Sequence, residues 1–205
     1  IGPVFNRNLI GLDKYEDAIF LSLTNKVLNN PKNVISSGIN ANSQFRAIKK
    51  FQKENDLKQT LVLIPKKDYK EEIEKAIKDS KLNSKKIFYY DTEPTKLTKQ
   101  IEKVTRYQIR KQNLADEIRR IENSEEENKE KKLEILNRRD TLGKIGYDSI
   151  IIADFDESLK SVATSLLYTD VSSKRISYLT LNQWFDESLL KETSLHSPMN
   201  SILSC

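Results

Sequence analysis

TLVLIPKKDYKEEIEKAIKDSKLNSKKIFYY, residues 60–90, is the segment that decides the predicted fold of this chain. The apolar runs at residues 60–64 and 86–90 have the length and the β-branched and aromatic content of buried strands. Between them, Ile73 and Ile77 lie four residues apart on one helix face, which predicts a helix over Lys70–Ser80. A strand, a helix and a second strand in this order are typical of a parallel sheet with a right-handed crossover.

The same alternation continues towards the C-terminus. DSIIIA at residues 148–153 predicts a third strand, residues 158–168 a helix, and ISYLTL at residues 176–181 a fourth strand. Strands rich in Ile, Leu and Val that alternate with helices favour an α/β fold, in which helices flank a parallel sheet on both faces.

Towards the N-terminus the pattern predicts one more helix and three short strand segments. The helix is expected over residues 41–55, with Asn42 or Ser43 as its N-cap. Its apolar positions recur at three-residue spacing and are Phe45, Ile48 and Phe51. The short strand segments are expected at residues 1–5, 17–23 and 33–39.

A charged helical insertion interrupts the alternation at about residues 95–139. Its apolar residues form short stripes at helical spacing, and residues 122–130 contain no apolar side chain. This predicts two helices in a hairpin that turns near residues 123–128, or else one long helix with a solvated middle. In either case we expect an arm outside the core, and its charge favours a solvated excursion over a partner-binding element.

Composition excludes several classes of protein. The 35 basic and 30 acidic residues give a net charge of +5, but Lys and Glu are mixed along the chain, which disfavours nucleic-acid binding. The single cysteine, Cys205, excludes an internal disulfide. No apolar run approaches the roughly 18 residues of a membrane span. The opening IGPVF resembles the interior of a strand, so we expect a fragment that lacks any targeting signal.

The chain has few residues for catalysis. Its one histidine is His196, and it has no phosphate-binding glycine motif and no Cys/His set with metal-ligand spacing, so we expect no enzyme activity, cofactor or metal. Asp154, Asp156 and Glu157 follow a predicted strand. A cation site there is conceivable, but we favour the interpretation that Asp156 or Glu157 caps the next helix.

Polar and aromatic residues recur where the predicted strands end. Open α/β sheets bind ligands outside the carboxyl ends of their strands, so these residues are candidates for a cleft that takes a small polar ligand or a peptide-like partner. The candidates are Asn6, Ser22, Thr24, Asn25, Tyr69, Asp154 and Trp184.

The order of several motifs resembles one family. The segments IGPVF, AIFLSLTN, GINANSQFRAIKKFQKE, TLVLIPKKDY, RRDTLGKIGYDS and LTLNQWFDESLLKE resemble the penicillin-binding protein activator branch of the type I periplasmic binding, or leucine/isoleucine/valine-binding, family. Lys70 stands where that family usually has glycine, and Ala153 where it has proline.

The resemblance implies a fragment of a two-lobed protein. Residues 1–40 would be a partial first lobe, residues 41–192 the second lobe with its helical insertion, and residues 193–205 an irregular tail. It also implies a periplasmic protein, in some relatives an outer-membrane lipoprotein.

Two functions follow from the resemblance. The first is a non-catalytic activator that contacts a penicillin-binding protein, a peptidoglycan synthase. The alternative is a solute-binding receptor of an ABC transporter that takes amino acids or related metabolites. A receptor needs a site for the α-carboxylate and the α-ammonium of its ligand, for which Thr24 and Asp154 are the candidates. An enzyme of the same layered fold ranks third because no nucleophile–base set is present.

Overall fold

The structure is a computed structural model that describes residues 11–22, 31–37, 39–181 and 202–204. Within these ranges the side chains of Ser36, Asp156 and residues 202–204 are not described. The predicted strand at residues 1–5 and the candidates Asn6, Thr24, Asn25 and Trp184 lie outside the described residues.

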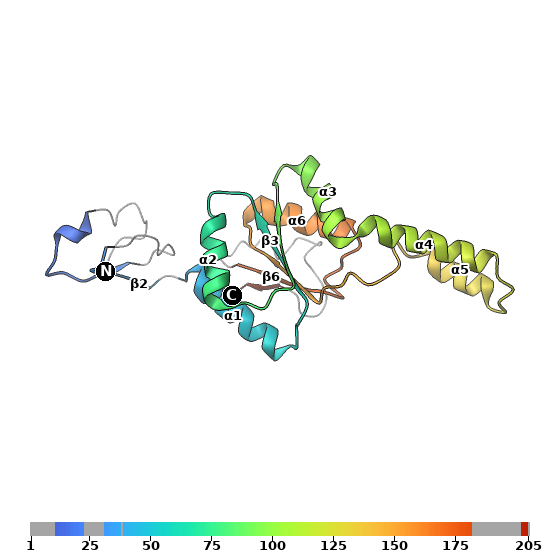
Figure 1. The fold of residues 1–205 in the computed structure, drawn as a ribbon, viewed down its shortest axis with the longest axis horizontal. Helices are drawn as coiled ribbons and strands as arrows, with labels where there is room; N and C mark the ends of the chain where they lie inside the picture. Colours follow the sequence, from blue (N-terminus) through green and yellow to red (C-terminus); the bar gives the residue numbers. More distant parts are fainter. Residues whose placement is uncertain (1–10, 23–30, 38, 182–201, 205) are drawn as a thin grey trace.

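A parallel sheet forms the centre of the molecule, which confirms the predicted fold class (Figure 1). Its strand order is β4-β3-β5-β6-β7, and every neighbouring pair is parallel. The strands are β3 (Thr60–Pro65), β4 (Lys86–Tyr90), β5 (Ser149–Ile152), β6 (Ser177–Thr180) and β7 (Ile202–Ser204). The tail at residues 193–205 is expected from the sequence to be irregular, but its residues 202–204 form the short strand β7, which pairs with β6.

Helices cover both faces of this sheet, as the uninterrupted apolar strands require. The helices α1 (Ala41–Glu54) and α2 (Lys70–Ser80) share one core with Val62 and Ile64 of β3. The helices α3 (Pro94–Thr105) and α6 (Asp156–Tyr168) share the other core with Leu61 and Leu63. Because side chains alternate along a strand, one buried run of β3 supplies both cores.

The helix α3 belongs to the core, which corrects the prediction that the arm begins near residue 95 and lies wholly outside the core. Leu97, Ile101 and Val104 are buried with α6 against the sheet. The charged residues of this helix lie on its solvent face, and they make the composition of the segment resemble that of a solvated arm.

The arm consists of α4 (Tyr107–Glu122) and α5 (Lys129–Asn137), which form the predicted hairpin and extend away from the sheet (Figure 1). Arg106, with a φ of 55°, separates α3 from α4. A small apolar cluster of Leu114, Ile121 and Leu136 holds the two arm helices together.

Two further strands lie near the N-terminus, apart from the main sheet (Figure 1). β1 (Phe20–Ser22) and β2 (Val34–Ser36) are parallel, and they follow the 3-10 turn η2 (Leu12–Lys14). They confirm strands within the predicted segments 17–23 and 33–39, although both are shorter than predicted.

The N-cap of α1 differs from the prediction. The helix begins at Ala41, so the cap is Asn40, whose Oδ1 accepts a hydrogen bond from the Ser43 backbone N–H at 2.9 Å. Asn42 and Ser43 lie inside the first turn, where the backbone is helical and not extended as it is at an N-cap residue.

Candidate functional site

The site lies where β3, β4 and β5 end at one edge of the sheet. Pro65 pairs in register with Tyr90, and Leu63 pairs with Ile152. The Ala153 backbone N–H donates to the Leu63 carbonyl at 2.9 Å, which extends the pairing beyond β5. Asp154 follows at once and is fully buried.

Four hydrogen bonds surround the Asp154 carboxylate. Its Oδ1 accepts from Lys67 Nζ at 3.0 Å, from the Tyr69 hydroxyl at 2.7 Å and from the Phe155 backbone N–H at 2.9 Å. Its Oδ2 accepts from the Tyr90 hydroxyl at 2.6 Å. An ionised carboxylate has about four lone-pair positions, so this one is close to saturation.

Lys67 is the cation paired with this buried charge. Its Nζ also donates to Ser158 Oγ at 2.8 Å, and it lies 5.9 Å from the centre of the Tyr69 ring. The Tyr69 ring packs against Phe155 with centroids 5.2 Å apart. The lysine therefore connects the loop after β3 to the first turn of α6, and one third of its side chain remains exposed (32%).

Tyr90, like Asp154, has no exposed surface. Burial raises the pKa of Tyr90, and the adjacent Asp154 charge raises it further. The hydroxyl therefore stays protonated and remains a donor to the carboxylate.

Neither Asp156 nor Glu157 occupies the N-cap position of α6, which corrects the predicted cap. The N-cap is Phe155, which makes no side-chain cap hydrogen bond, and Glu157 is exposed and pairs with Lys160 at 2.9 Å. Asp154 points into the protein, where the Lys67 ammonium and two tyrosine hydroxyls donate to its carboxylate. Hydrogen bonds to an ionised group are stronger than those between neutral groups. Among the described residues no group of three or more His, Cys, Asp or Glu side chains could hold a metal ion.

Of the sequence candidates, the structure brings Tyr69 and Asp154 together. Ser22 is buried in the two-stranded sheet, where its carbonyl accepts from the Ser37 backbone N–H at 2.9 Å. Lys67 and Tyr90 were not among the candidates. Each follows or ends a predicted strand, and this position could have indicated them.

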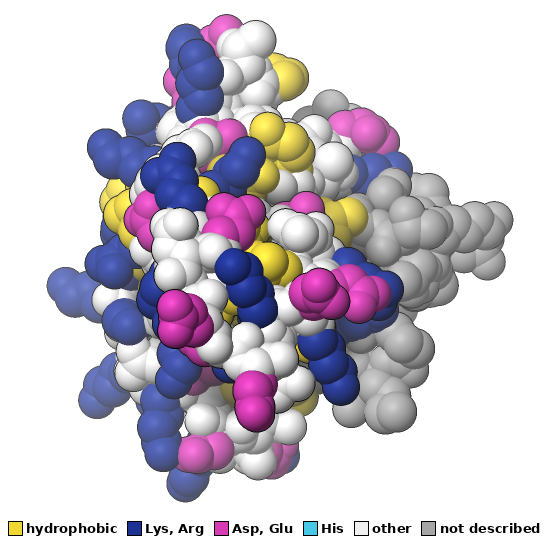
Figure 2. All heavy atoms as spheres, turned by 90° about the vertical axis from the view of Figure 1, so that its right-hand side faces the viewer, with side chains coloured by type: hydrophobic (Ala, Val, Ile, Leu, Met, Phe, Trp, Pro, Cys, Tyr) yellow, Lys and Arg dark blue, Asp and Glu magenta, His cyan; other side chains and the backbone are white. Residues whose placement is uncertain are grey.

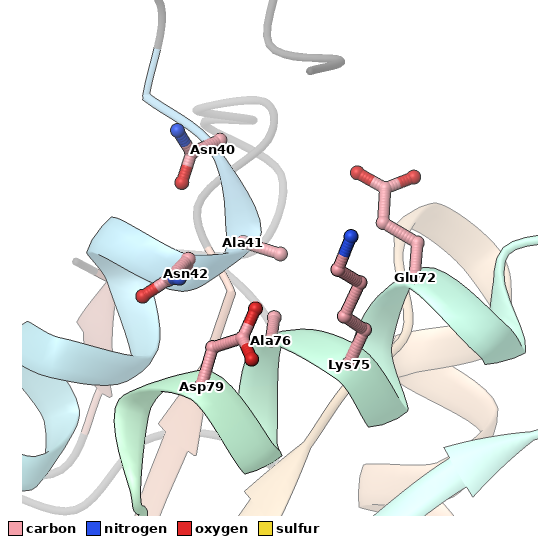
Figure 3. A pocket seen from close by; sticks show the side chains of 7 residues that line it. All are labelled: Asn40, Ala41, Asn42, Glu72, Lys75, Ala76 and Asp79. Atoms are coloured by element: carbon pink, nitrogen blue, oxygen red, sulfur yellow. The ribbon is translucent and has the colours of Figure 1, made fainter. Parts of the chain in front are cut away.

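A separate hollow of about 170 Å³ lies between the start of α1 and α2 (Figure 3). It is lined by Asn40, Ala41, Asn42, Glu72, Lys75, Ala76 and Asp79. One cation and two anions around a shallow hollow define no single ligand class, and Asn40 is already engaged as the cap of α1.

The parallel sheet with helices on both faces has the architecture of a type I periplasmic-binding-like fold, and three solved structures are similar to it. An extracellular ligand-binding receptor from Verminephrobacter eiseniae superposes with a TM-score of 0.55 at 6% identity, over 89% of this chain and 44% of that one. Full-length LpoA from Haemophilus influenzae gives 0.55 at 12% identity, over 98% and 31%. The C-domain of LpoA (YraM) from Haemophilus influenzae, described as a regulator of PBP1A, gives 0.54 at 12% identity, over 98% and 52%.

At these identities the likeness shows the fold alone. The chain spans about a third to a half of the length of the three structures. No protein-family model matches the sequence, and no curated protein matches it. In the ranges that the structure describes, no helix combines the length and the apolar character that a membrane crossing requires.

Proposed function

We propose that this chain is part of a non-catalytic, periplasmic interaction protein that activates a penicillin-binding protein. One observation carries the choice over a solute receptor. The buried carboxylate at the edge of the sheet, the group expected to hold a ligand ammonium, already has the ammonium of Lys67 at 3.0 Å.

A ligand would have to displace part of this arrangement. Asp154 is fully buried and accepts from a lysine, two tyrosines and a backbone N–H. Loss of one donor from a buried charge costs several kcal/mol unless the ligand replaces it in the same geometry. The site therefore favours a role in stability, and it leaves the exterior of the molecule for binding.

The solved structures support the same choice at the level of the fold. Two of the three compared structures are of LpoA, one of them described as a regulator of PBP1A. The third is a ligand-binding receptor, and it supports the alternative of an amino-acid receptor. The proposed partner is thus a peptidoglycan synthase, and a lipoprotein anchor remains part of the proposal.

Calorimetry and a binding assay test this function together. We expect no heat when the chain is titrated with each of the common amino acids. We also expect direct binding to a purified penicillin-binding protein of the same organism, with faster glycan polymerisation in its presence. Heat with an amino acid would favour the receptor, and an inactive, non-binding chain would exclude the activator.

A lysine pair sharpens the first measurement. Lys67→Met removes the internal ammonium, whereas Lys66→Met removes an exposed charge from the adjacent residue. A latent amino-acid site would appear as heat with Lys67→Met and not with Lys66→Met. That result would mean that the lysine blocks a receptor site, in contradiction of the proposal.

A further inference from the structure

The end of α6 and the start of α4 are locked together at the base of the arm. The buried Arg110 guanidinium donates from Nε to the Thr105 carbonyl at 3.1 Å, from Nη1 to Thr141 Oγ1 at 2.8 Å, and to the Thr169 carbonyl. Asp170 lies 3.8 Å from the same guanidinium. Arg110 therefore ties the first turn of α4 to the end of α3, to Thr141 and to the residue that follows α6.

Next to this lock lies a surface that we call the Tyr168 surface, formed by the exposed side chains of Lys111, Leu167 and Tyr168 and by the buried ring of Tyr107. Tyr168 is 59% exposed and Leu167 is 47% exposed. The ring of Tyr107, almost fully buried, supports that of Tyr168 at a centroid distance of 5.7 Å. Lys111 Nζ lies 5.6 Å from the Tyr107 ring, on the helix turn that follows.

The chain at this junction is basic. Residues 103–115 contain four basic and no acidic residues, namely Lys103, Arg106, Arg110 and Lys111. Arg110 is buried in the lock, but the other three side chains are exposed. Figure 2 shows the end of the molecule that carries the arm, where Lys and Arg side chains alternate with Asp and Glu side chains.

The arm beyond the junction is different in charge. Arg120 pairs with Glu117 at 2.8 Å and with Glu126 at 3.1 Å, and Lys132 also pairs with Glu126. These charges neutralise one another on the arm itself. The unbalanced positive charge is thus at the base of the arm, beside the exposed tyrosine and leucine.

We infer that the Tyr168 surface is a docking site for an acidic segment of the partner protein, one that presents an apolar side chain flanked by carboxylates. This inference rests on the proposed function. A rigid, exposed tyrosine supported by a second ring is the kind of residue that dominates binding energy at protein interfaces. The Lys111 ammonium beside the Tyr107 ring complements a negative partner and speeds association with it.

The chain offers matched controls for both parts of this surface. Ile109 is 58% exposed and lies two residues beyond Tyr107, about 200° around the helix, so it faces away from Tyr168. Lys131 is exposed on α5, at a distance from the junction along the arm. Ile109→Ala matches Tyr168→Ala in exposure, and Lys131→Glu matches Lys111→Glu in charge.

Binding of the full chain to a purified penicillin-binding protein of the same organism, measured by biolayer interferometry at low and high salt, tests the inference. We expect Tyr168→Ala to weaken binding about tenfold or more, mainly through faster dissociation. Lys111→Glu should slow association several-fold at low salt and less at high salt. The two control variants should bind within about twofold of the unaltered chain, as near-neutral positions do.

The outcomes separate the inference from the proposed function. If the unaltered chain binds and both test variants bind equally well, the Tyr168 surface is not the docking site, although the activator function stands. If the test and control variants weaken binding alike, the site is likewise overturned. If the unaltered chain does not bind, the proposed function fails and this inference fails with it. Circular dichroism of each variant excludes loss of fold as the cause.

Discussion

Removal of the Asp154 carboxylate should destabilise the folded chain strongly. Asp154→Ala removes the carboxylate that accepts from the Lys67 ammonium and from the hydroxyls of Tyr69 and Tyr90. The Tyr90 hydroxyl suffers most, because the residue is fully buried and water cannot replace the carboxylate.

The magnitude follows from burial and charge. Removing one partner from a buried charged network costs about 3–5 kcal/mol of unfolding free energy. Lys67 is only partly buried, so part of its loss is recovered by solvation, and we expect the lower end of that range, about 3 kcal/mol. A domain with a total stability of about 5–15 kcal/mol should survive this change in the cold.

A double-mutant cycle isolates the cause. In the unaltered chain, Tyr90→Phe removes a hydrogen bond of 2.6 Å to a carboxylate and should cost about 1.5–3 kcal/mol. In the Asp154→Ala background the same change removes an unsatisfied buried hydroxyl, and it should instead restore about 1–3 kcal/mol. Urea unfolding followed by circular dichroism measures all four proteins, with equal slopes as the test of a common unfolded state.

The sign of the Tyr90→Phe effect is the decisive result. If Tyr90→Phe destabilises both backgrounds by the same amount, the two residues act independently and the described network does not contribute as argued. Should Asp154→Ala fail to fold, Asp154→Asn keeps the shape and one acceptor oxygen, and the same reversal should then be reduced but still measurable.

Three further predictions test other parts of the structure. Burial raises the pKa of both Tyr90 and Tyr178 above the value of 10.0 in the unfolded chain, so stability is complete below pH 10 and falls as the pH rises further. Each tyrosine should contribute about 1.4 kcal/mol of lost unfolding free energy per pH unit. Tyr90→Phe should remove the contribution of Tyr90, as measured by urea unfolding at a series of alkaline pH values. If the unfolding free energy falls with pH as steeply in this variant as in the unaltered chain, the prediction is wrong. Ile101→Ala should lower the unfolding free energy by about 2–5 kcal/mol, because Ile101 is buried in the core beside α6. Ile135→Ala, on the arm at 48% exposure, should change it by under about 0.5 kcal/mol. Equal effects of the two variants would show that α3 does not belong to the core. Arg110→Gln should cost about 3–5 kcal/mol and speed hydrogen exchange at the start of α4, and an unaffected exchange pattern would show that Arg110 does not anchor the arm.

The parallel sheet could be predicted from the sequence because each buried strand is a short, nearly continuous apolar run. The run at residues 60–64 became β3, and Lys86–Tyr90 is β4 with the predicted bounds. The helix α3 could not be assigned correctly from composition. Its Leu97, Ile101 and Val104 show helical spacing, but only the packing against α6 decides whether such a stripe meets the sheet or a second arm helix.

The site was predictable only in part, for a related reason. Its strand-end position identified Asp154, since polar groups gather there in open α/β sheets. Its partners are distant in sequence: Lys67 and Tyr69 precede it by 87 and 85 residues, and Tyr90 by 64. Pairing over such distances depends on the register of three strands, and a strand pattern alone does not specify that register.

The Lys67–Asp154 pair also bears on how this fold is used. An amino-acid receptor binds the α-ammonium group of its ligand, but here the tethered Lys67 ammonium competes with that group at an effective concentration of the order of millimolar. A ligand present at micromolar concentration would need many other contacts to displace the lysine, and it would also have to supply the hydrogen bond that Ser158 now accepts. A fold of this class does not dictate its function, which depends on the site that it carries. Under the proposed function, the internal cation makes the edge of the sheet a structural element, and we expect binding at exposed surfaces such as the base of the arm.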